Sequence, residues 1–312
     1  MVDVVCLGIL VADVVAKPVE AMPDRGKLLL VDQMELHTGG CAGNTGIGLS
    51  RLGIRASVAG KVGNDGFGDF YVTRLRKEGL DTQGVVRDGV TTTSATMVLV
   101  HADGERSFIH YLGANATLTD ADVQTDWLRG AKLLHLAGAL LMPRFDGEPM
   151  ARVLKQARQM GLTTTLDTAW DSTGRWMKTL APCLPHVDVF LPSIEEARML
   201  TGRQEPGAVA QALMDRGVKT VALKMGEQGC YVRSPEGEWR LPAYRIEVVD
   251  ATGAGDAFAA GYLAGMVKGW DMEKTGRFAN AVGALCTLAI GTTAGIRGLE
   301  ESLEFMDRTP TR

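Results

Sequence analysis

A glycine-rich segment in the C-terminal quarter of the chain contains residues suited to handling an anion. Asp250-Ala-Thr-Gly-Ala-Gly-Asp256 follows a β-branched stretch at residues 246–249 and leads into an Ala- and Gly-rich run that is typical of a buried helix. The first amides of a helix lack intrahelical partners, and the helix dipole favours negative charge there. Gly253 and Gly255 would let a phosphate approach the backbone closely. The segment therefore predicts a strand, an anion-binding turn and a helix, in that order.

Asp256 lies inside this predicted anion site, where its carboxylate would repel a resting anion. A carboxylate is useful there if it accepts the proton of an attacking hydroxyl during phosphoryl transfer. The alternative is that Asp256 only caps the helix, because Asp is favoured at that position. Capping alone requires neither the two glycines nor the preceding Asp-Ala-Thr, so the pattern favours phosphoryl transfer. The amides that would stabilise the transferred group are those of Gly253, Ala254, Gly255 and Asp256.

A second glycine-rich segment, Gly39-Gly-Cys-Ala-Gly-Asn44, opens a predicted helix in the N-terminal part of the chain. Gly39 and Gly40 would let a substrate lie against backbone amides, and Asn44 can donate and accept hydrogen bonds at once. Asp13 follows the first predicted strand, where its carboxylate could accept two hydrogen bonds from a vicinal diol. Plainer explanations stay open, because paired glycines also form hinges and Asp is common in turns.

The two segments resemble the N- and C-terminal signatures of the ribokinase-like (PfkB-type) carbohydrate and nucleoside kinases. The N-terminal signature continues through Arg51-Leu-Gly53 and Gly60-Lys-Val-Gly63-Asn-Asp65-Gly-Phe-Gly68, and the resemblance runs from Val4 to about Gly298. Ala251 stands where the family usually has Thr, Ser or Pro. Because two separated signatures occur in the expected order, the resemblance is specific. It implies an ATP-dependent kinase that phosphorylates a hydroxyl of a sugar or nucleoside, with Asp256 as the base.

The resemblance also implies the residues that hold each ligand. Sugar hydroxyls would contact Asp13, Gly39, Gly40 and Asn44, with Asn115 as a weaker candidate. ATP would lie against Ser193, Lys224, Gly226, Gly229 and Asn280. Glu196 would help to hold Mg²⁺ on the ATP phosphates through water. In many relatives a monovalent cation such as K⁺ is held near the anion loop by the counterparts of Asp250, Thr252, Cys286 and Gly291, the last two through nearby backbone carbonyls.

Several of these positions have a structural alternative. Ser193-Ile-Glu-Glu196 fits a capping box at the start of a helix, which could coexist with a role for Glu196 near the metal. Ser193 stands where many relatives have Asn, so a nucleotide contact at this position is in doubt. Asn280 lies on an Ala-rich predicted helix and could equally be a polar residue at the surface.

Two other functional classes compete with the kinase. Gly253-Ala-Gly255-Asp-Ala-Phe258 partly matches the dinucleotide-binding fingerprint of a nicotinamide-dependent dehydrogenase, but Phe258 is too large for the third small position. A non-catalytic sugar or nucleotide sensor on the same fold is the third class, and the intact Asp256 argues against it. Among possible substrates an acidic sugar is disfavoured, because Asp167-Thr-Ala-Trp-Asp171 lacks the Asn and Arg of the Asp-x-Asn-x-Arg stretch seen in fructokinase- and ketodeoxygluconate-kinase-like relatives.

The elements that must position these residues alternate along the chain. Short apolar runs predict strands at residues 4–7, 56–59, 133–136, 163–166, 187–191 and 221–223, with amphipathic segments such as 65–78 between them. This pattern predicts one α/β domain over residues 1–312, with a doubly wound, mostly parallel sheet and helices on both faces. Residues 15–38 and 94–111 break the rhythm and predict a small β-sheet lid. Two such lids packing on each other would give a homodimer.

The amino-acid composition limits which binding partners and which cellular compartment we expect for this protein. The 312 residues are 46% hydrophobic and 22% charged, with a net charge of −4, so the chain can bury a large core and offers no electrostatic footprint for nucleic acid. Five scattered cysteines without a Cys-x-x-Cys pair favour a reducing, cytoplasmic location over a disulfide framework or a structural zinc site. No apolar run is long enough to span a membrane, and no basic leader precedes the first strand.

Overall fold

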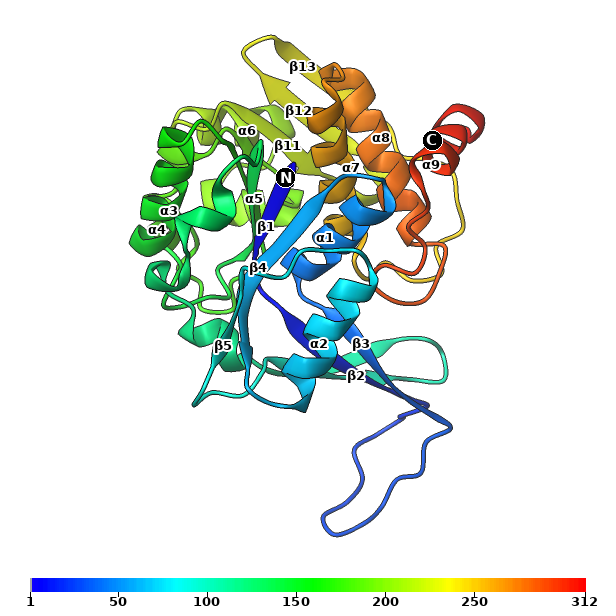
Figure 1. Cartoon of the computed structure of the whole chain (residues 1–312). Coiled ribbons are helices and arrows are strands. Elements are labelled where there is room, and N and C mark those ends of the chain that lie inside the picture. The colour runs from blue at the N-terminus through cyan, green and yellow to red at the C-terminus, as the bar shows by residue number, and fades with distance from the viewer. Residues whose placement is uncertain (1) are drawn as a thin grey trace.

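The computed structural model describes residues 2–312, in which the largest element is a nine-stranded sheet (Figure 1). Its order is β13-β12-β11-β10-β9-β8-β1-β4-β5, parallel from β5 to β11 and antiparallel at β12 and β13. The strands are β1 Val4–Gly8, β4 Ala56–Gly63, β5 Val85–Asp88, β8 Leu133–Ala139, β9 Thr163–Thr168, β10 Val189–Phe190, β11 Thr220–Lys224, β12 Cys230–Ser234 and β13 Gly237–Leu241. The mostly parallel sheet predicted from the alternating pattern is confirmed.

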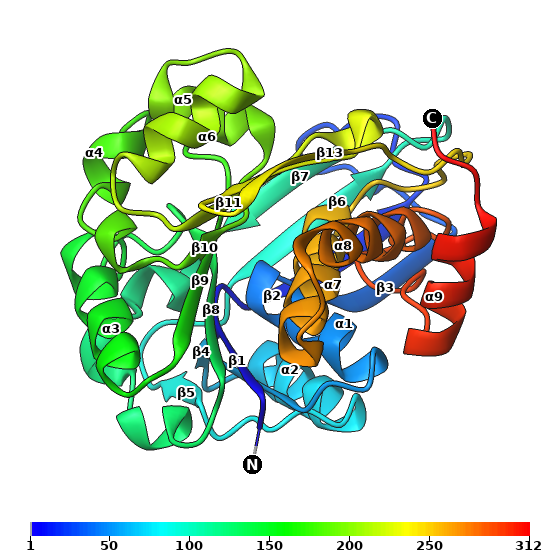
Figure 2. The same ribbon diagram turned by 90° about the horizontal axis from the view of Figure 1, so that it is seen from above.

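Helices cover both faces of this sheet, as Figure 2 shows. One layer contains α1 Cys41–Arg51, α2 Gly66–Lys77, α7 Ala254–Lys268, α8 Met272–Cys286 and α9 Leu299–Arg308. The other contains α3 Glu148–Gln159, α4 Trp176–Leu180, α5 Ile194–Thr201 and α6 Pro206–Met214. Short 3₁₀ turns occur at Gly113–Thr117, Asp120–Asp122, Thr125–Leu128, Leu184–His186 and Gly226–Gln228.

Strand β1 shows why the sheet needs two helical layers. Its residues are all buried, and they alternate between two apolar cores: Val5 and Leu7 pack into one, Val4 and Cys6 into the other. Successive side chains of a strand point to opposite faces, so an apolar strand without alternation must be covered on both sides. None of the helices in residues 2–312 has the length and apolar character that a transmembrane segment requires.

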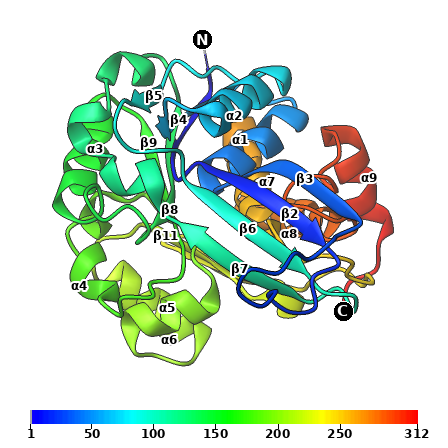
Figure 3. The same ribbon diagram turned by 90° about the horizontal axis from the view of Figure 1, so that it is seen from below.

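A separate four-stranded sheet forms the predicted lid (Figure 3). Its order is β3-β2-β6-β7, built from β2 Val11–Lys17, β3 Gln33–Gly39, β6 Ala95–Val100 and β7 Arg106–Tyr111. Strand β2 follows β1 after only two residues, so the lid continues directly from the main sheet. The strands therefore lie within the two segments expected from sequence, except that β2 begins at Val11, before residue 15, and β3 ends at Gly39.

Two stretches in which strand structure was expected lack it: part of the lid segment 15–38 and the predicted strand at residues 246–249. Residues 28–32 belong to a projecting loop, because β2 ends at Lys17, which pairs with Gln33, and Pro18 cannot continue the ladder. Residues 246–249 also lack strand structure, since the edge of the main sheet is already occupied by β13. The amides of Val249 and Asp250 donate instead to the carbonyl of Thr287 at the end of α8.

Candidate active site

The predicted anion loop is a turn that leads into α7. Gly253 precedes the helix with a φ of 79°, and a Cβ at this position would lie 2.1 Å from the carbonyl oxygen of Thr292. Glycine is therefore required both for the backbone conformation and for the close approach. The carboxylate of Asp256 follows in the first turn of α7, next to the free amides at the helix start.

Asn44 connects Asp256 to the second glycine-rich segment. Its Nδ2 donates to Asp256 Oδ2 at 2.8 Å, and the neighbouring Thr45 hydroxyl lies 3.4 Å from the Asp256 carbonyl oxygen. Burial raises the pKa of Asp256, while the hydrogen bond from Asn44 and the charge of Lys224 partly offset this effect. Asn44 Oδ1 is buried and has no hydrogen-bond partner among residues 2–312. An acceptor thus remains free beside the carboxylate.

Lys224, at the end of β11, forms a buried ion pair that the sequence did not reveal. Its Nζ lies 2.6 Å from Asp167 Oδ2, and both side chains are almost inaccessible to water. Burial alone would lower the pKa of Lys224, but the surrounding carboxylates of Asp167, Glu196 and Asp256 outweigh burial and raise it. The ammonium group also lies 3.3 Å from the position of a Cβ on Gly255, so it faces the anion loop.

Asp13 belongs to the lid strand β2 and faces the start of α1. A Cβ on Gly39 would lie 2.0 Å from Asp13 Oδ2, so this glycine makes room for the carboxylate. Burial raises the pKa of Asp13 to about 6, although the hydrogen bond with Thr96 and the charge of His37 each lower it to a smaller extent. The Tyr71 hydroxyl donates to the carbonyl oxygen of Gly39 at 2.5 Å and fixes the same turn. Asp13, Gly39, Gly40 and Asn44 are therefore brought together, as predicted.

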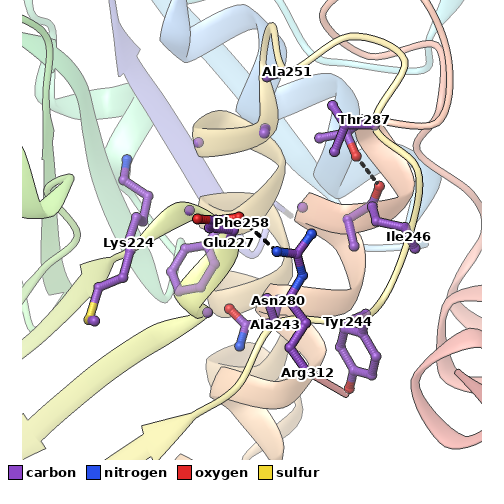
Figure 4. Close-up of a pocket in the computed structure, with 18 residues that line it drawn as sticks. Lys224, Glu227, Ala243, Tyr244, Ile246, Ala251, Phe258, Asn280, Thr287 and Arg312 are labelled. Carbon is purple, nitrogen blue, oxygen red and sulfur yellow. Dashed lines mark hydrogen bonds and ion pairs between the residues drawn. The ribbon is translucent and has the colours of Figure 1, made fainter. Parts of the chain in front are cut away.

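A pocket of about 260 Å³ adjoins the anion loop, as Figure 4 shows. Its walls come from α7, α8 and the turn after β11. They include Gly226, Gly229, Asn280 and the apolar side chains of Tyr244 and Phe258. Lys224 and Gly255 line it as well, so the pocket reaches the anion loop. An apolar pocket of this kind suits a flat heterocyclic ring whose charged group lies at the loop.

Comparison of the sequence with known protein families assigns this chain to a family. A model described as pfkB family carbohydrate kinase matches residues 1–297. The chain belongs to this family. Over 284 residues it is 30% identical to 2-dehydro-3-deoxygluconokinase of Bacillus subtilis (strain 168), covering 87% of each chain. The kinase interpretation is thus supported over the dehydrogenase and the sensor.

Solved structures agree with this assignment. Arabidopsis thaliana ribokinase, complexed with ribose and ATP, matches the kinase with a TM-score of 0.84 and 25% identity, over 98% of this chain and 99% of that one. A ribokinase II-type protein from E. coli, in complex with ATP and Mg²⁺, matches with a TM-score of 0.86 and 24% identity, over 99% and 100% of the two chains. The ribokinase-like fold expected from the resemblance is confirmed.

Two predicted contact residues of the kinase have internal hydrogen bonds. Asn115 is 1% exposed, and its amide accepts from the amide of Leu10 and donates to the carbonyl of Leu10, both at 3.1 Å. Both polar atoms of the Asn115 side chain thus hold the β1–β2 junction, and a substrate contact at Asn115 stays a prediction. Asn280 Nδ2 donates to the carbonyls of Leu241 and Pro242 at 3.0 and 3.2 Å, while the residue still lines the pocket.

Ser193 and Glu196 form the capping box that the sequence indicated. Ser193 Oγ accepts from the amide of Glu196 at 3.3 Å, and Glu196 Oε2 accepts from the amide of Ser193 at 3.0 Å. Glu196 Oε2 also accepts from the hydroxyl of Thr168 at 3.1 Å. Capping and the carboxylate cluster around Lys224 thus use the same glutamate, and the role of Glu196 near the metal stays a prediction.

The residues predicted to hold a monovalent cation lie together beside the anion loop of the kinase. Gly291 donates its amide to Asp250 Oδ2 at 2.9 Å, and Cys286 Sγ lies 3.8 Å from the carbonyl of Thr252. The guanidinium of Arg106, from lid strand β7, donates to both Asp250 and Thr252. Arg106 was not singled out from sequence, because a lid strand gives no sign of contacting a segment 144 residues away.

Proposed function

We propose that this kinase transfers the γ-phosphoryl group of ATP to a hydroxyl of a neutral sugar, with Asp256 as the catalytic base. The observation that carries the proposal is the hydrogen bond between Asn44 and Asp256. It supports the proposal because it joins Asp256, at the start of α7, to Asn44 in the glycine-rich segment that would hold the sugar. A hydroxyl held near Asn44 would therefore meet the carboxylate and a phosphoryl group at one point.

The reaction needs one bond formed and one broken. The sugar oxygen attacks the γ-phosphorus, its proton passes to Asp256, and the bond to the bridging oxygen of ADP breaks. The amides of Gly253, Ala254, Gly255 and Asp256 would stabilise the negative charge on the transferred group. The Lys224 ammonium, fixed by Asp167 at 2.6 Å, would add positive charge on the nucleotide side of the loop.

Nucleotide and metal would occupy the side of the anion loop opposite the lid. The pocket lined by Lys224, Gly226, Gly229 and Asn280 would take the base and ribose of ATP. The site fits an Mg²⁺ ion held mainly by the ATP phosphates and water, because Glu196 offers a carboxylate near Lys224 while no group of three or more His, Cys, Asp or Glu side chains in residues 2–312 could hold a metal alone. Glu196 would hold the ion through water, and Mg²⁺ would neutralise phosphate charge. Ser193 would contribute indirectly, because its capping-box hydrogen bonds hold Glu196 in place.

The sugar side favours an uncharged substrate. Two acceptors there would suit hydroxyl groups: the carboxylate of Asp13, which faces Gly39, and Oδ1 of Asn44, which has no partner among residues 2–312. An additional carboxylate on the substrate would face two acidic side chains, Asp13 and Asp256. The curated relative from Bacillus subtilis is named for an acidic sugar, so this inference separates the present kinase from that relative.

Assembly and location are part of the same proposal. Met97 and Ile109 are cross-strand neighbours on the lid face opposite Asp13, and they remain 46% and 47% exposed. A second lid would bury this apolar face and give a symmetric dimer. The cysteines are all free, which supports a reducing compartment such as the cytoplasm.

The experiment is an ADP-release screen with Mg-ATP against neutral sugars, nucleosides and 2-keto-3-deoxy sugar acids. We expect turnover with a neutral sugar that depends on Mg²⁺ and is lost in Asp256→Asn. A preference for a sugar acid would overturn the neutral-substrate inference while leaving the kinase assignment intact. Binding of sugars without any ADP release would instead support a sensor.

A further inference from the structure

Arg106 connects the lid to the segment that precedes the anion loop. It is the first residue of β7, and its guanidinium donates to the carboxylate of Asp250 and to the hydroxyl of Thr252. The Asp250 side chain is 7% exposed and that of Arg106 is 25% exposed, so the pair is largely shielded from water. A charge-assisted contact in such a place is much stronger than a surface ion pair.

The oxygen atoms near this pair are already engaged. Asp250 Oδ1 accepts from the amide of Thr252 at 2.8 Å as well as from Arg106, and Oδ2 accepts from the amide of Gly291 at 2.9 Å. Cys286 Sγ lies 3.3 Å from the carbonyl of Thr292 and 3.8 Å from that of Thr252. Burial would raise the pKa of Asp250, but these amides and Arg106 outweigh it and lower the pKa.

A monovalent cation does not fit this arrangement. Its ligands would include the carboxylate of Asp250, whose Oδ1 already accepts from Arg106, and the guanidinium also contacts the hydroxyl of Thr252. Binding would therefore require the guanidinium to leave, or two positive charges to share one carboxylate at close range. The expectation of K⁺, drawn from the family resemblance, is thus at odds with the contacts of Arg106.

We propose that Arg106 supplies from the lid the positive charge that a monovalent cation supplies in cation-dependent relatives, and thereby positions the anion loop. This inference rests on the proposed phosphoryl transfer at Asp256. Arg106 is a positioning residue, because it acts through Asp250 and Thr252, which lead directly into Gly253. The kinase would then need no K⁺ for activity.

The same contact makes the anion loop dependent on the lid. Gly253 packs against the carbonyl of Thr292, and the Thr292 hydroxyl donates to the carbonyl of Thr38 on lid strand β3 at 3.1 Å. Lid strands β3 and β7 therefore both contact the segments that shape the loop. A lid held over a sugar would keep Arg106 on Asp250 and complete the cradle for the phosphoryl group.

The test compares kcat and the KM for Mg-ATP in buffers of matched ionic strength, with either KCl or tetramethylammonium chloride. We expect the unaltered kinase to be indifferent to K⁺. In Arg106→Met, kcat without K⁺ should fall by about tenfold or more, as expected for a misplaced anion cradle, and K⁺ should restore it. Arg106→Lys should remain independent of K⁺. Arg129→Met, which removes an exposed ion pair with Asp126, is the matched control.

A second readout does not depend on turnover. Thermal unfolding of Arg106→Met should shift to higher temperature with K⁺ but not with tetramethylammonium, whereas the unaltered protein should show no such difference. K⁺ activation of the unaltered kinase would overturn the inference, and so would a loss in Arg106→Met that K⁺ does not restore. If no sugar is phosphorylated, the unfolding measurement still decides whether Arg106 excludes K⁺, separately from the proposed function.

Discussion

Asn44 Nδ2 lies 2.8 Å from Asp256 Oδ2, although the two residues are 212 positions apart in the chain. The contact joins the start of α1, which carries the paired glycines, to the start of α7, which carries the anion loop. Both helices pack side by side on one face of the main sheet (Figure 2). Asp256, the proposed base, is thus hydrogen-bonded by a residue of the segment proposed to bind the sugar and lies beside the amides proposed to bind the phosphoryl group.

The first prediction concerns the pH dependence of this pair. Asp256 must be ionised to accept a proton, so kcat should fall as the pH drops through its raised pKa, above the ordinary value of 3.8. Asn44 donates to the carboxylate and therefore lowers this pKa. Asn44→Leu should move the acid limb of the kcat profile to higher pH. A profile unchanged by the substitution would mean that Asn44 does not tune the base.

The second prediction concerns Asp13 and the sugar. Asp13→Ala would leave sugar hydroxyls without an acceptor, at a cost of about 1–3 kcal/mol per lost partner. Sugar affinity should therefore weaken by roughly one to two orders of magnitude, with ATP affinity nearly unchanged. Calorimetric titration of both ligands checks this. Equal losses for sugar and ATP, or no loss for either, would place Asp13 outside the sugar pocket.

The titration of Asp13 gives a third prediction, which needs no substitution. Burial raises its pKa to about 6, so the carboxylate becomes protonated as the pH falls through that value. A neutral carboxyl is a weaker acceptor of sugar hydroxyls than a carboxylate. The KM for the sugar should rise below about pH 6 in the unaltered kinase, and this rise should be absent in Asp13→Ala. A flat KM in the unaltered protein would contradict the assignment.

The fourth prediction concerns the mouth of the nucleotide pocket. Arg312 lines the pocket and its guanidinium lies 2.7 Å from Glu227 Oε2 (Figure 4). Arg312→Gln should raise the KM for ATP by roughly threefold to tenfold without changing kcat, because an exposed charge contact contributes only about 1 kcal/mol. Arg308→Gln is the control, since Arg308 pairs with Glu304 and does not line the pocket. Equal kinetics for both variants would remove Arg312 from nucleotide binding.

The fifth prediction concerns assembly. Light scattering at micromolar concentration should give the mass of a dimer, because the apolar lid face would otherwise remain in water. Ile109→Lys should shift the protein to a monomer by placing a charge in the buried contact. Phe67→Lys, a change at a partly exposed apolar residue of α2, should leave the dimer intact. A monomeric mass for the unaltered protein would contradict assembly through the lid.

The sequence predicted those features that depend on local pattern. Residues 65–78 gave α2 almost to the residue, because Asp65 caps it and accepts from the amide of Gly68 at 2.9 Å. Lid strands β6 and β7 lie within residues 94–111, which were assigned to the lid because they break the alternation of strands and helices, and they pair antiparallel. By contrast, residues 246–249 have strand-forming side chains and no strand partner. Whether a β-branched segment pairs is decided by which sheet edges are free, and a single sequence does not contain that information.

Of the candidate site, likewise, the sequence predicted the local features but not the contacts between distant segments. Gly253, Gly255 and Asp256 follow from the chemistry of a helix start, which is local. The ion pair of Lys224 with Asp167 and the contact of Arg106 with Asp250 join segments that are 57 and 144 residues apart. Charged residues are common throughout the chain, so nothing in their local context marks these particular partners. Such contacts become visible only when the fold brings the strand ends together.

The central claim is that Asp256 accepts the proton of the sugar hydroxyl, and single-turnover kinetics of Asp256→Asn test it most directly. Asn keeps the size of the side chain, so we expect unchanged ATP binding and an unchanged unfolding temperature. The rate of phosphoryl transfer should fall by about 10²–10⁴-fold, the usual contribution of a general base. A variant that retains most of its transfer rate would contradict the assignment of Asp256 as the base.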